Sequence, residues 1–275
     1  MNKNKLRQVC QDKARQLSLP FNSVYTCYFL EHVLRKVATS RYNGNFLFKG
    51  GFLLSNIVGV SNRTTKDVDF SLNNAALTKD NVLRMFKDIL ESTEDEIKTS
   101  IEKIEPIREE DEYGGFRLTI LCKFENIRVV LPVDIATGDV VTPAPVEYAY
   151  KSMFGEPFTL PSYTVQTIVA EKLQTLYKRG LFNSRCKDFY DLYLLFKIQK
   201  DNLNREVLLT ACKNTFENRK TELSFGAIVD LLEAIKNDAG LVTRWNAFAR
   251  RNAYASDLTF ADVIDEIRNF VDSLK

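Results

Sequence analysis

Two neighbouring segments of the sequence alternate strictly between apolar and other side chains, and this pattern requires a β-sheet. The first is FRLTILCKF, residues 116–124, and the second is IRVVLPVDI, residues 127–135. Because successive side chains of a strand point to opposite faces, each segment presents one apolar face that must be buried. Only Glu125 and Asn126 separate the two segments, so we predict an antiparallel hairpin with a tight turn.

Helical segments precede these strands. Residues 5–17 and 22–39 repeat apolar side chains at helical spacing, and residues 78–92 do the same behind Thr78, a typical helix cap. The run NFLFKGG predicts a short strand that ends at a glycine pair, and a short helix follows it. Helices and strands therefore share one domain of the α/β class.

The pattern changes after this domain. Residues 140–165 hold four of the seven prolines and break every periodic pattern, so we predict the connection between two domains there. Beyond this region the sequence is helical to its last residue. We therefore expect an α/β plus α protein, with a mixed-sheet domain over residues 1–155 and a helical bundle domain over residues 156–275.

Two acids stand in an otherwise apolar run, GVSNRTTKDVDFSL. Asp67 and Asp69 are two residues apart and would lie on one face of a strand, where like charges are unfavourable. Such a pair indicates either a solvated strand end or a bound cation. Asp134, on the outer face of the second hairpin strand, is a third candidate ligand. Three carboxylates of this kind suit Mg²⁺ and two-metal phosphoryl transfer.

A glycine pair, Gly50 and Gly51, lies between the predicted strand and helix ahead of these acids. Glycines let the backbone approach a ligand closely, and the N-terminus of the following helix offers N–H groups to a phosphate. The pair matches neither the dinucleotide fingerprint nor the P-loop. Taken alone, it indicates an ordinary structural turn.

The composition excludes several kinds of chemistry. His32 is the one histidine, and the five cysteines are scattered, so triad hydrolysis, disulfide scaffolds and histidine-based zinc sites are not expected. With 38 Lys and Arg against 36 Asp and Glu, the chain has no global positive field. No run approaches the roughly 18 apolar residues of a membrane span, and the N-terminus lacks a signal-peptide core. We expect a cytoplasmic protein without a membrane partner.

The run KGGFLLSNIVGVSNRTTKDVDFSL resembles the first motif of the AbiEii/AbiGii family of abortive-infection toxins, which have a nucleotidyltransferase fold. VDIATGDVVTPAP resembles the family's next segment, with Asp134 and Asp139, and IVAEKLQTLYKRGLFNSRCKDFYDLYLL is similar to its helical motif. The resemblance covers residues 46–196. The positions that match the first motif are Gly50, Gly51, Arg63, Thr65, Asp67 and Asp69.

The resemblance implies roles for residues of the helical domain. Lys172 would contact the nucleotide phosphates, and Asp188, or alternatively Asp191, would complete the site, with the nucleotide between the two domains. Gln166 departs from the acid expected in relatives, which affects the placement of Lys172. From the residues alone, this group of charges indicates a solvated helix face.

The expected reaction is the Mg²⁺-dependent transfer of a nucleoside monophosphate from GTP or another NTP to RNA, with tRNA as the expected acceptor. Asp67, Asp69 and Asp134 would hold the metal, and Gly50 and Gly51 the phosphate. Arg63, Thr65 and Lys172 would bind the nucleotide, while Asp188 would act as base or positioning group. We predict that Asp69→Asn and Lys172→Ala abolish transfer and leave the fold intact.

The family also implies a toxin that arrests growth and aborts phage infection as an antiviral defence. An antitoxin encoded beside it would neutralise the toxin without direct binding. Two alternatives remain: a small-molecule nucleotidyltransferase of the aminoglycoside type, and a nucleotide-binding module without turnover. We expect Trp245 and Phe248 to be core residues. A set of basic residues forms either an RNA-backbone surface or ordinary solvated charge: Lys178, Arg179, Arg185, Lys187, Arg244, Arg250 and Arg251.

Overall fold

The computed structural model describes residues 1–91, 95–107 and 114–275. It divides into two compact units by its internal contacts. The first unit comprises Met1–Gly138 and Val146–Ser162, and the second comprises Asp139–Pro145 and Tyr163–Lys275. The domain boundary at residue 155 stays a prediction.

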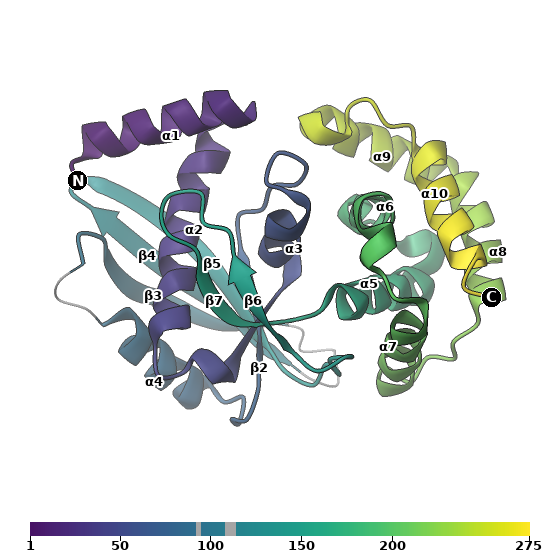
Figure 1. Ribbon diagram of the computed structural model, residues 1–275, viewed down its shortest axis with the longest axis horizontal. Helices are drawn as coiled ribbons and strands as arrows, with labels where there is room; N and C mark the ends of the chain where they lie inside the picture. The colour runs from purple at the N-terminus through teal and green to yellow at the C-terminus, as the bar shows by residue number, and fades with distance from the viewer. Residues whose placement is uncertain (92–94, 108–113) are drawn as a thin grey trace. The chain divides into compact units, whose positions relative to one another are not determined.

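The first unit is a mixed sheet with helices packed on it, which confirms the predicted α/β class (Figure 1). Within the described residues, seven strands follow the order β3-β4-β5-β2-β1-β7-β6. The strands are β1 (Phe46–Lys49), β2 (Val68–Leu72), β3 (Lys98–Ile107), β4 (Gly115–Phe124), β5 (Ile127–Ala136), β6 (Val146–Tyr150) and β7 (Phe158–Ser162). The α-helices are α1 (Lys3–Leu17), α2 (Phe21–Thr39), α3 (Gly50–Val58) and α4 (Lys79–Leu90).

Several local predictions in this unit are confirmed. Thr78 caps α4 by accepting a hydrogen bond from the backbone N–H of Asn81, at 3.2 Å. The β4–β5 hairpin closes at the pair Phe124 and Ile127, so its loop is the two predicted residues. These features form where the sequence predicts them because short-range chemistry alone decides them.

Two strands that the sequence analysis did not predict lie within the predicted connection over residues 140–165. Strands β6 and β7 form there as an antiparallel pair, and β7 joins the sheet by one parallel register pair, Phe48 with Ser162. β7 includes Pro161, which cannot donate to a strand ladder. Pairing with strands that are distant in the sequence therefore overrides the local proline signal.

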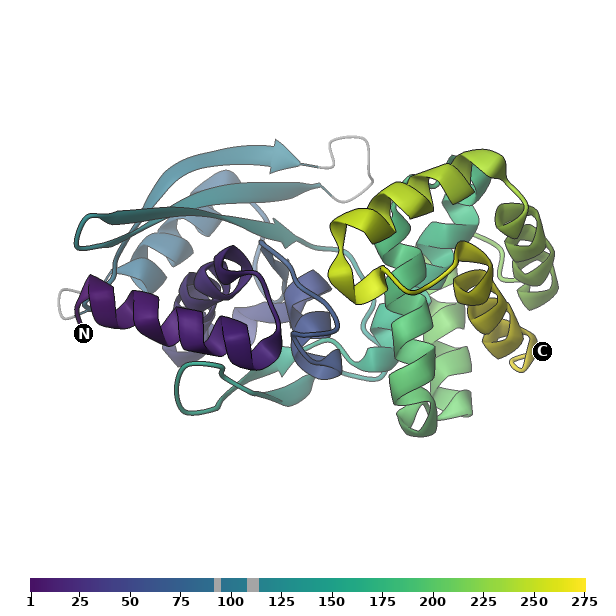
Figure 2. The same ribbon diagram turned by 90° about the horizontal axis from the view of Figure 1, so that it is seen from above.

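The core of the first unit is aromatic around β1 and β2. Phe46 and Phe48 of β1 pack against Phe70 of β2, with ring centroids 5.6 and 6.2 Å apart. All three side chains are buried. Helices α2 and α4 pack on the sheet and on each other (Figure 2). This packing fixes β2, and therefore fixes the position of the acid-bearing segment along it.

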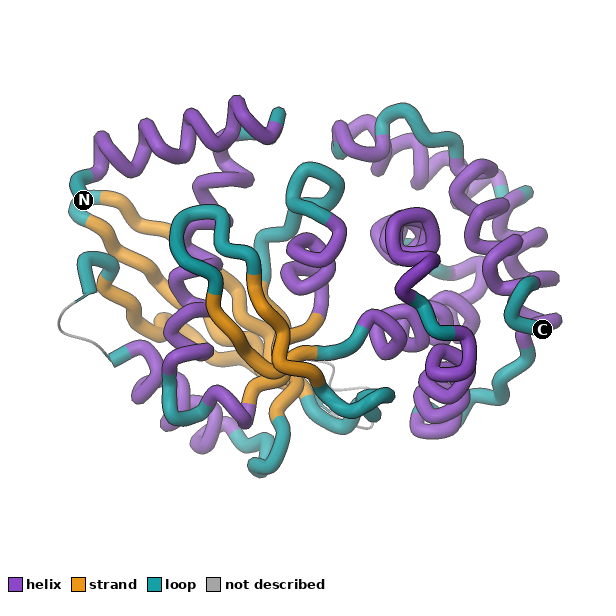
Figure 3. Tube along the Cα trace, viewed as in Figure 1, coloured by secondary structure: helices purple, strands orange, loops and turns teal. Residues whose placement is uncertain are grey.

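The second unit is helical, as Figure 3 shows by colour, and it confirms the predicted C-terminal helices. Trp245 is fully buried and its indole N–H donates to the carbonyl of Leu258 at 3.0 Å, so the prediction of a core residue is confirmed. In the described part of the chain, no helix is long and apolar enough to cross a membrane. The α-helices are α5 (Val165–Arg179), α6 (Cys186–Gln199), α7 (Arg205–Asn218), α8 (Phe225–Lys236), α9 (Ala239–Arg251) and α10 (Phe260–Asp272).

Candidate functional site

Charged side chains occupy matched positions on four neighbouring strands of the first unit. Lys49 on β1 is in register with Asp69 on β2, and Asp69 is in register with Asp134 on β5. Asp134 in turn is opposite Arg117 on β4. Residues in register point to the same face of a sheet. We call these four residues, with Asp67 two positions before Asp69, the charged row.

Asp69 lies at the centre of the charged row, and its electrostatic environment is unfavourable. Burial, followed by the negative charges of Asp67 and Asp134, raises the pKa of its carboxyl to about 6. Lys49 and the backbone N–H of Gly51, 3.4 Å from Asp69 Oδ2, act against this rise. The row therefore gathers more negative charge than its own cations neutralise, which is the property of a cation site.

Steric constraints explain why glycines occupy positions 50 and 51. Gly50 has φ of +70°, and a Cβ there would lie 2.0 Å from Asp69 Oδ2. A Cβ on Gly51 would lie 2.7 Å from the Arg63 guanidinium. Both glycines are thus needed so that Asp69 and Arg63 can approach the first turn of α3. There the helix N-terminus favours negative charge.

Arg63 and Thr65 are fixed by hydrogen bonds beside this turn. Arg63 is buried, its Nη1 donates to the carbonyl of Thr64 at 2.9 Å, and its own carbonyl accepts from Ser55 Oγ. Thr65 Oγ1 donates to Asp67 Oδ1. The structure therefore brings the residues of the first family motif together at one end of β2.

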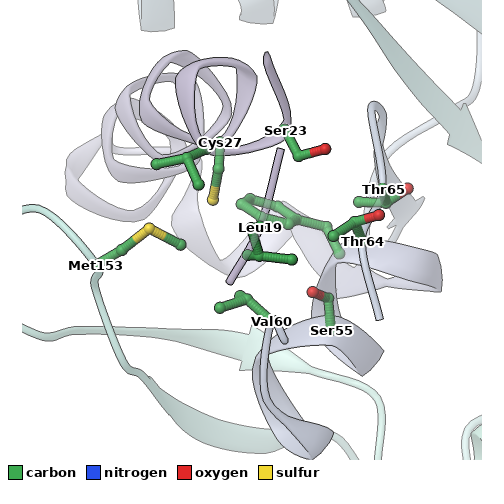
Figure 4. A pocket seen from close by; sticks show the side chains of 10 residues that line it. Leu19, Ser23, Cys27, Ser55, Val60, Thr64, Thr65 and Met153 are labelled. Atoms are coloured by element: carbon green, nitrogen blue, oxygen red, sulfur yellow. The ribbon is translucent and has the colours of Figure 1, made fainter. Parts of the chain in front are cut away.

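A small cavity borders this motif (Figure 4). Thr64, Thr65 and Ser55 line it together with apolar side chains that include Leu19 and Cys27. Its volume is only about 10 Å³. A space of that size holds one water molecule. This cavity is therefore a packing space behind the motif and is not a binding site for a nucleotide.

Arg117 is a member of the site that the sequence reasoning missed. Its Nε lies 2.6 Å from Asp134 Oδ1 and its Nη2 lies 2.7 Å from Asp134 Oδ2. This bidentate hydrogen bonding raises the pKa of Arg117. A signal was available in the sequence. Arg117 lies seven positions before Phe124 and Asp134 seven positions after Ile127, so the two-residue hairpin turn places them opposite each other.

The three candidate carboxylates fit Mg²⁺ incompletely as they stand. Asp67 and Asp69 supply carboxylate oxygens, the ligands that Mg²⁺ prefers. Both oxygens of Asp134, however, are engaged by Arg117. Consistently, the described residues contain no group of three or more His, Cys, Asp or Glu side chains arranged as metal ligands. A third carboxylate ligand at Asp134 would require Arg117 to release one of its oxygens.

A second group of charges lies in the helical unit, between α5 and α6. Lys172 Nζ is 2.9 Å from Asp188 Oδ1 and 2.8 Å from Asp191 Oδ2. Arg185 Nε is 3.1 Å from Asp188 Oδ2. Burial works against the charge on Lys172, but Asp191 and Asp188 outweigh it and raise the pKa of this lysine. We call these four residues the Lys172 cluster; both candidate aspartates contact the lysine within it.

A third ionic contact, which the sequence reasoning also missed, attaches the segment 139–145 to the helical unit. Arg219 Nη2 is 2.8 Å from Asp139 Oδ1 and 3.2 Å from Glu171 Oε1. Burial works against the charge on Arg219, whereas Glu171 and Asp139 outweigh it and raise the pKa of the guanidinium. Arg219 thus holds Glu171, the neighbour of Lys172 on α5. No local pattern pointed to Arg219, because its partners are distant in the sequence.

His32 takes no part in either group of charges. Burial, followed by the positive charge of Lys36, lowers the pKa of His32 to about 4, so the imidazole is neutral at neutral pH. It borders a cavity of about 750 Å³ whose other lining residues include Lys36, Arg41 and Asp88. None of the predicted site residues lines that cavity.

A mixed sheet with a glycine turn and strand-borne aspartates, followed by a helical unit, defines the class of nucleotidyltransferase-fold proteins. Residues 32–267 match the model of the family described as nucleotidyl transferase AbiEii toxin, type IV toxin–antitoxin system. The chain belongs to this family, as the sequence resemblance predicted.

Two solved structures from Helicobacter pylori share the fold. One, assigned as a nucleotidyltransferase, aligns with a TM-score of 0.55 at 14% sequence identity and covers 93% of this chain and 96% of that chain. The other, JHP933, aligns with a TM-score of 0.53 at 14% identity and covers 90% and 91%. No curated protein matches the sequence. At such low identity, the two structures support the fold alone.

Proposed function

We propose that the protein transfers a nucleoside monophosphate from an NTP, such as GTP, to an RNA acceptor of the tRNA class, and that the reaction requires Mg²⁺. The observation that carries this proposal is the charged row. It holds three acids against two cations, with the Asp69 pKa raised to about 6. Family membership supports nucleotidyl transfer as the reaction type.

In this proposal Asp67 and Asp69 hold Mg²⁺, and Asp134 joins them when Arg117 releases one of its oxygens. When bound there, Mg²⁺ would polarise the α-phosphate and neutralise the charge of the leaving pyrophosphate. Asp69 and Asp134 already lie side by side on β2 and β5, so the release of Asp134 from Arg117 is the main rearrangement that the reaction would need.

The residues around the glycine turn orient the triphosphate. Gly50 and Gly51 place no side chain over the first turn of α3, whose N-terminus suits phosphate oxygens. Arg63 is buried against Gly51 and supplies a fixed positive charge there, and Thr65 orients Asp67 through its hydroxyl. These contacts would align the α-phosphorus with the attacking acceptor hydroxyl.

The Lys172 cluster serves the same reaction from the helical unit. Lys172 would neutralise charge on the phosphates, because its ammonium stays protonated beside two aspartates. Asp188 would accept the proton of the attacking hydroxyl or hold Lys172 in place. One bond forms, from the acceptor oxygen to the α-phosphorus, and the α–β phosphoanhydride bond breaks to release pyrophosphate.

The biological outcome follows from family membership. A modified RNA acceptor would halt translation, arrest growth and abort phage infection, and an adjacent antitoxin would counteract this without binding the toxin. This proposal places the protein in the cytoplasm, where NTPs and RNA are available.

A labelling experiment tests the proposed reaction. The protein is incubated with each α-labelled NTP, Mg²⁺, total RNA and a mixture of aminoglycosides, and Asp69→Asn serves as the matched control. We expect label in RNA with the parent protein and none with the variant. Label in the aminoglycosides would instead establish small-molecule transfer. Nucleotide binding without label in any acceptor would establish a module without turnover.

A further inference from the structure

One segment of the helical unit combines dense positive charge with an exposed aromatic ring. We call residues 178–187 the basic loop; it joins the end of α5 to the start of α6. Its ten residues contain no acid. Its four cations are all exposed: Lys178, Arg179, Arg185 and Lys187.

Phe182 is at the tip of this loop and is 94% exposed. The next most exposed large apolar residue among those described, Val130, is 57% exposed. A single exposed apolar side chain is ordinary, but a nearly fully exposed phenyl ring is not, because aromatic rings gain most from burial. Cations precede and follow Phe182 in the sequence. These surroundings favour a ligand that carries both planar rings and negative charge.

The loop presents Phe182 from a defined turn. Gly180–Phe182 is a single 3-10 turn, and the backbone N–H of Asn183 donates to the carbonyl of Gly180 at 3.1 Å. The side chain of Asn183 is fully buried, and its Oδ1 accepts from the backbone N–H of Arg185 at 3.1 Å. Little conformational entropy is therefore lost when a ligand contacts the ring.

We propose that the basic loop binds a single-stranded RNA segment, with Phe182 stacked on one base and the four cations contacting phosphates. Aromatic rings stack on any base, and cations follow the backbone, which is how single strands are bound. An apolar protein partner fits less well, because one ring offers too little apolar area and the four charges would repel it unless it were acidic.

The loop is also well placed for an acceptor RNA, and to this extent the inference rests on the proposed function. Arg185 of the loop contacts Asp188 of the Lys172 cluster at 3.1 Å. Lys172 and Arg179 are seven residues apart on α5, which corresponds to about 10 Å along a helix. A base held on Phe182 would keep the adjoining end of the strand close to the cluster.

The test is direct binding of a labelled 12-nucleotide single-stranded RNA, measured by fluorescence anisotropy without NTP. All variants are made in the full chain that carries Asp69→Asn, so that no transfer occurs. We expect Phe182→Ala to weaken binding about tenfold and Phe182→Trp to keep it within about twofold, because stacking on one base contributes such a factor. Ile198→Ala is the matched control; this residue of α6 is 43% exposed, and its replacement should leave binding unchanged.

The charges have their own measurement. Replacing Arg179 and Lys187 together by Gln should lower the slope of log K against log salt by about 1.4, since each phosphate contact on a single strand contributes about 0.7. A duplex of the same sequence should bind more weakly and should not respond to Phe182→Ala, because its bases are already stacked.

Two results would overturn the inference: unchanged single-strand binding by Phe182→Ala, or an equal loss in Ile198→Ala. Thermal unfolding of each variant, expected to match the parent, excludes misfolding as the cause. The two proposals fail separately. Absence of labelled RNA together with Phe182-dependent binding removes the transfer reaction and keeps the RNA site. Labelled RNA together with Phe182-independent binding removes the RNA site alone.

Discussion

The charged row and the Lys172 cluster contain the same kinds of side chain but differ in how their charges are satisfied. In the Lys172 cluster, two cations meet two buried aspartates at 2.8 to 3.1 Å, so the group neutralises itself. In the charged row, three acids face two cations, and the pKa of Asp69 is raised to about 6. The cluster therefore has no net charge of its own, whereas the row keeps an excess of negative charge.

This difference predicts opposite effects on stability for Lys172→Ala, which should destabilise the protein, and Asp69→Asn, which should stabilise it. The largest effect belongs to Lys172→Ala. It leaves Asp188 and Asp191 buried without their shared cation, which costs about 3 to 5 kcal/mol of unfolding free energy. Transfer activity should be lost as well. Chemical denaturation of the parent and the variant measures the loss of stability.

The matched control for this prediction is the double variant Lys172→Met/Asp191→Asn. It removes one buried negative charge together with the lysine, and it should recover part of the lost stability. An unfolding free energy for Lys172→Ala within about 1 kcal/mol of the parent would contradict a buried ionic role. The expectation drawn from the sequence, that Lys172→Ala leaves the fold intact, is thus replaced by one of destabilisation.

The second prediction concerns Asp69→Asn, which should stabilise the metal-free protein at pH 7.5. An Asp pKa raised from 3.8 to about 6 means that the folded state binds its proton more tightly than the unfolded state. Stability therefore falls as the pH rises from about 4 to about 6 and stays lower above that range. Removing the charge should restore about 3 kcal/mol at pH 7.5 and much less near pH 4. Urea unfolding in the presence of a chelator, at both pH values, measures this difference.

Asp88→Asn is a suitable comparison, since the Asp88 carboxyl on α4 has a lowered pKa owing to Tyr42 and Arg41. Its replacement should not stabilise the protein at pH 7.5. Equal stability of Asp69→Asn and the parent at both pH values would show that the charged row is not electrostatically unfavourable. Whatever its stability, Asp69→Asn should lose nucleotidyl transfer, because it removes a proposed metal ligand.

The same comparison shows which features a sequence can predict. Asp67, just before β2, and Asp69 within it are two positions apart, so their proximity was predictable from spacing alone. The cap at Thr78 and the hairpin turn were predictable for the same reason. The family motif added Lys172, Asp188 and Asp191 as candidates, but their mutual contacts required the packing of α5 on α6.

Features that depend on long-range pairing were not predicted. Strands β6 and β7 lie in a proline-rich segment, and β7 enters the sheet by pairing with β1, more than a hundred residues earlier. Arg219 meets Asp139 across 80 positions of sequence. Arg117 was an intermediate case, because the predicted hairpin already fixed its partner. Local propensity carries no information on the pairing of β7 with β1 or on the contact between Arg219 and Asp139, so neither was predicted.

The smallest expected effect comes from Arg117, and it sharpens the role of Asp134. The Arg117 side chain is 46% exposed, so Arg117→Gln should change metal-free stability by less than about 1 kcal/mol. If Asp134 is a ligand, its release from Arg117 should strengthen Mg²⁺ binding about threefold. That change adds about 0.6 kcal/mol to the stabilisation by saturating Mg²⁺, measured as a larger rise in melting temperature.

The double variant Arg117→Gln/Asp134→Asn separates a ligand from a mere partner of Arg117. As a ligand, Asp134 contributes an oxygen to the metal, so its loss should remove the gain from Arg117→Gln and weaken Mg²⁺ binding below that of the parent. If the double variant responds to Mg²⁺ as strongly as Arg117→Gln alone, Asp134 does not bind the metal. The charged row would then hold its cation with Asp67 and Asp69 only, and Asp134 would serve to position Arg117 at the edge of the site.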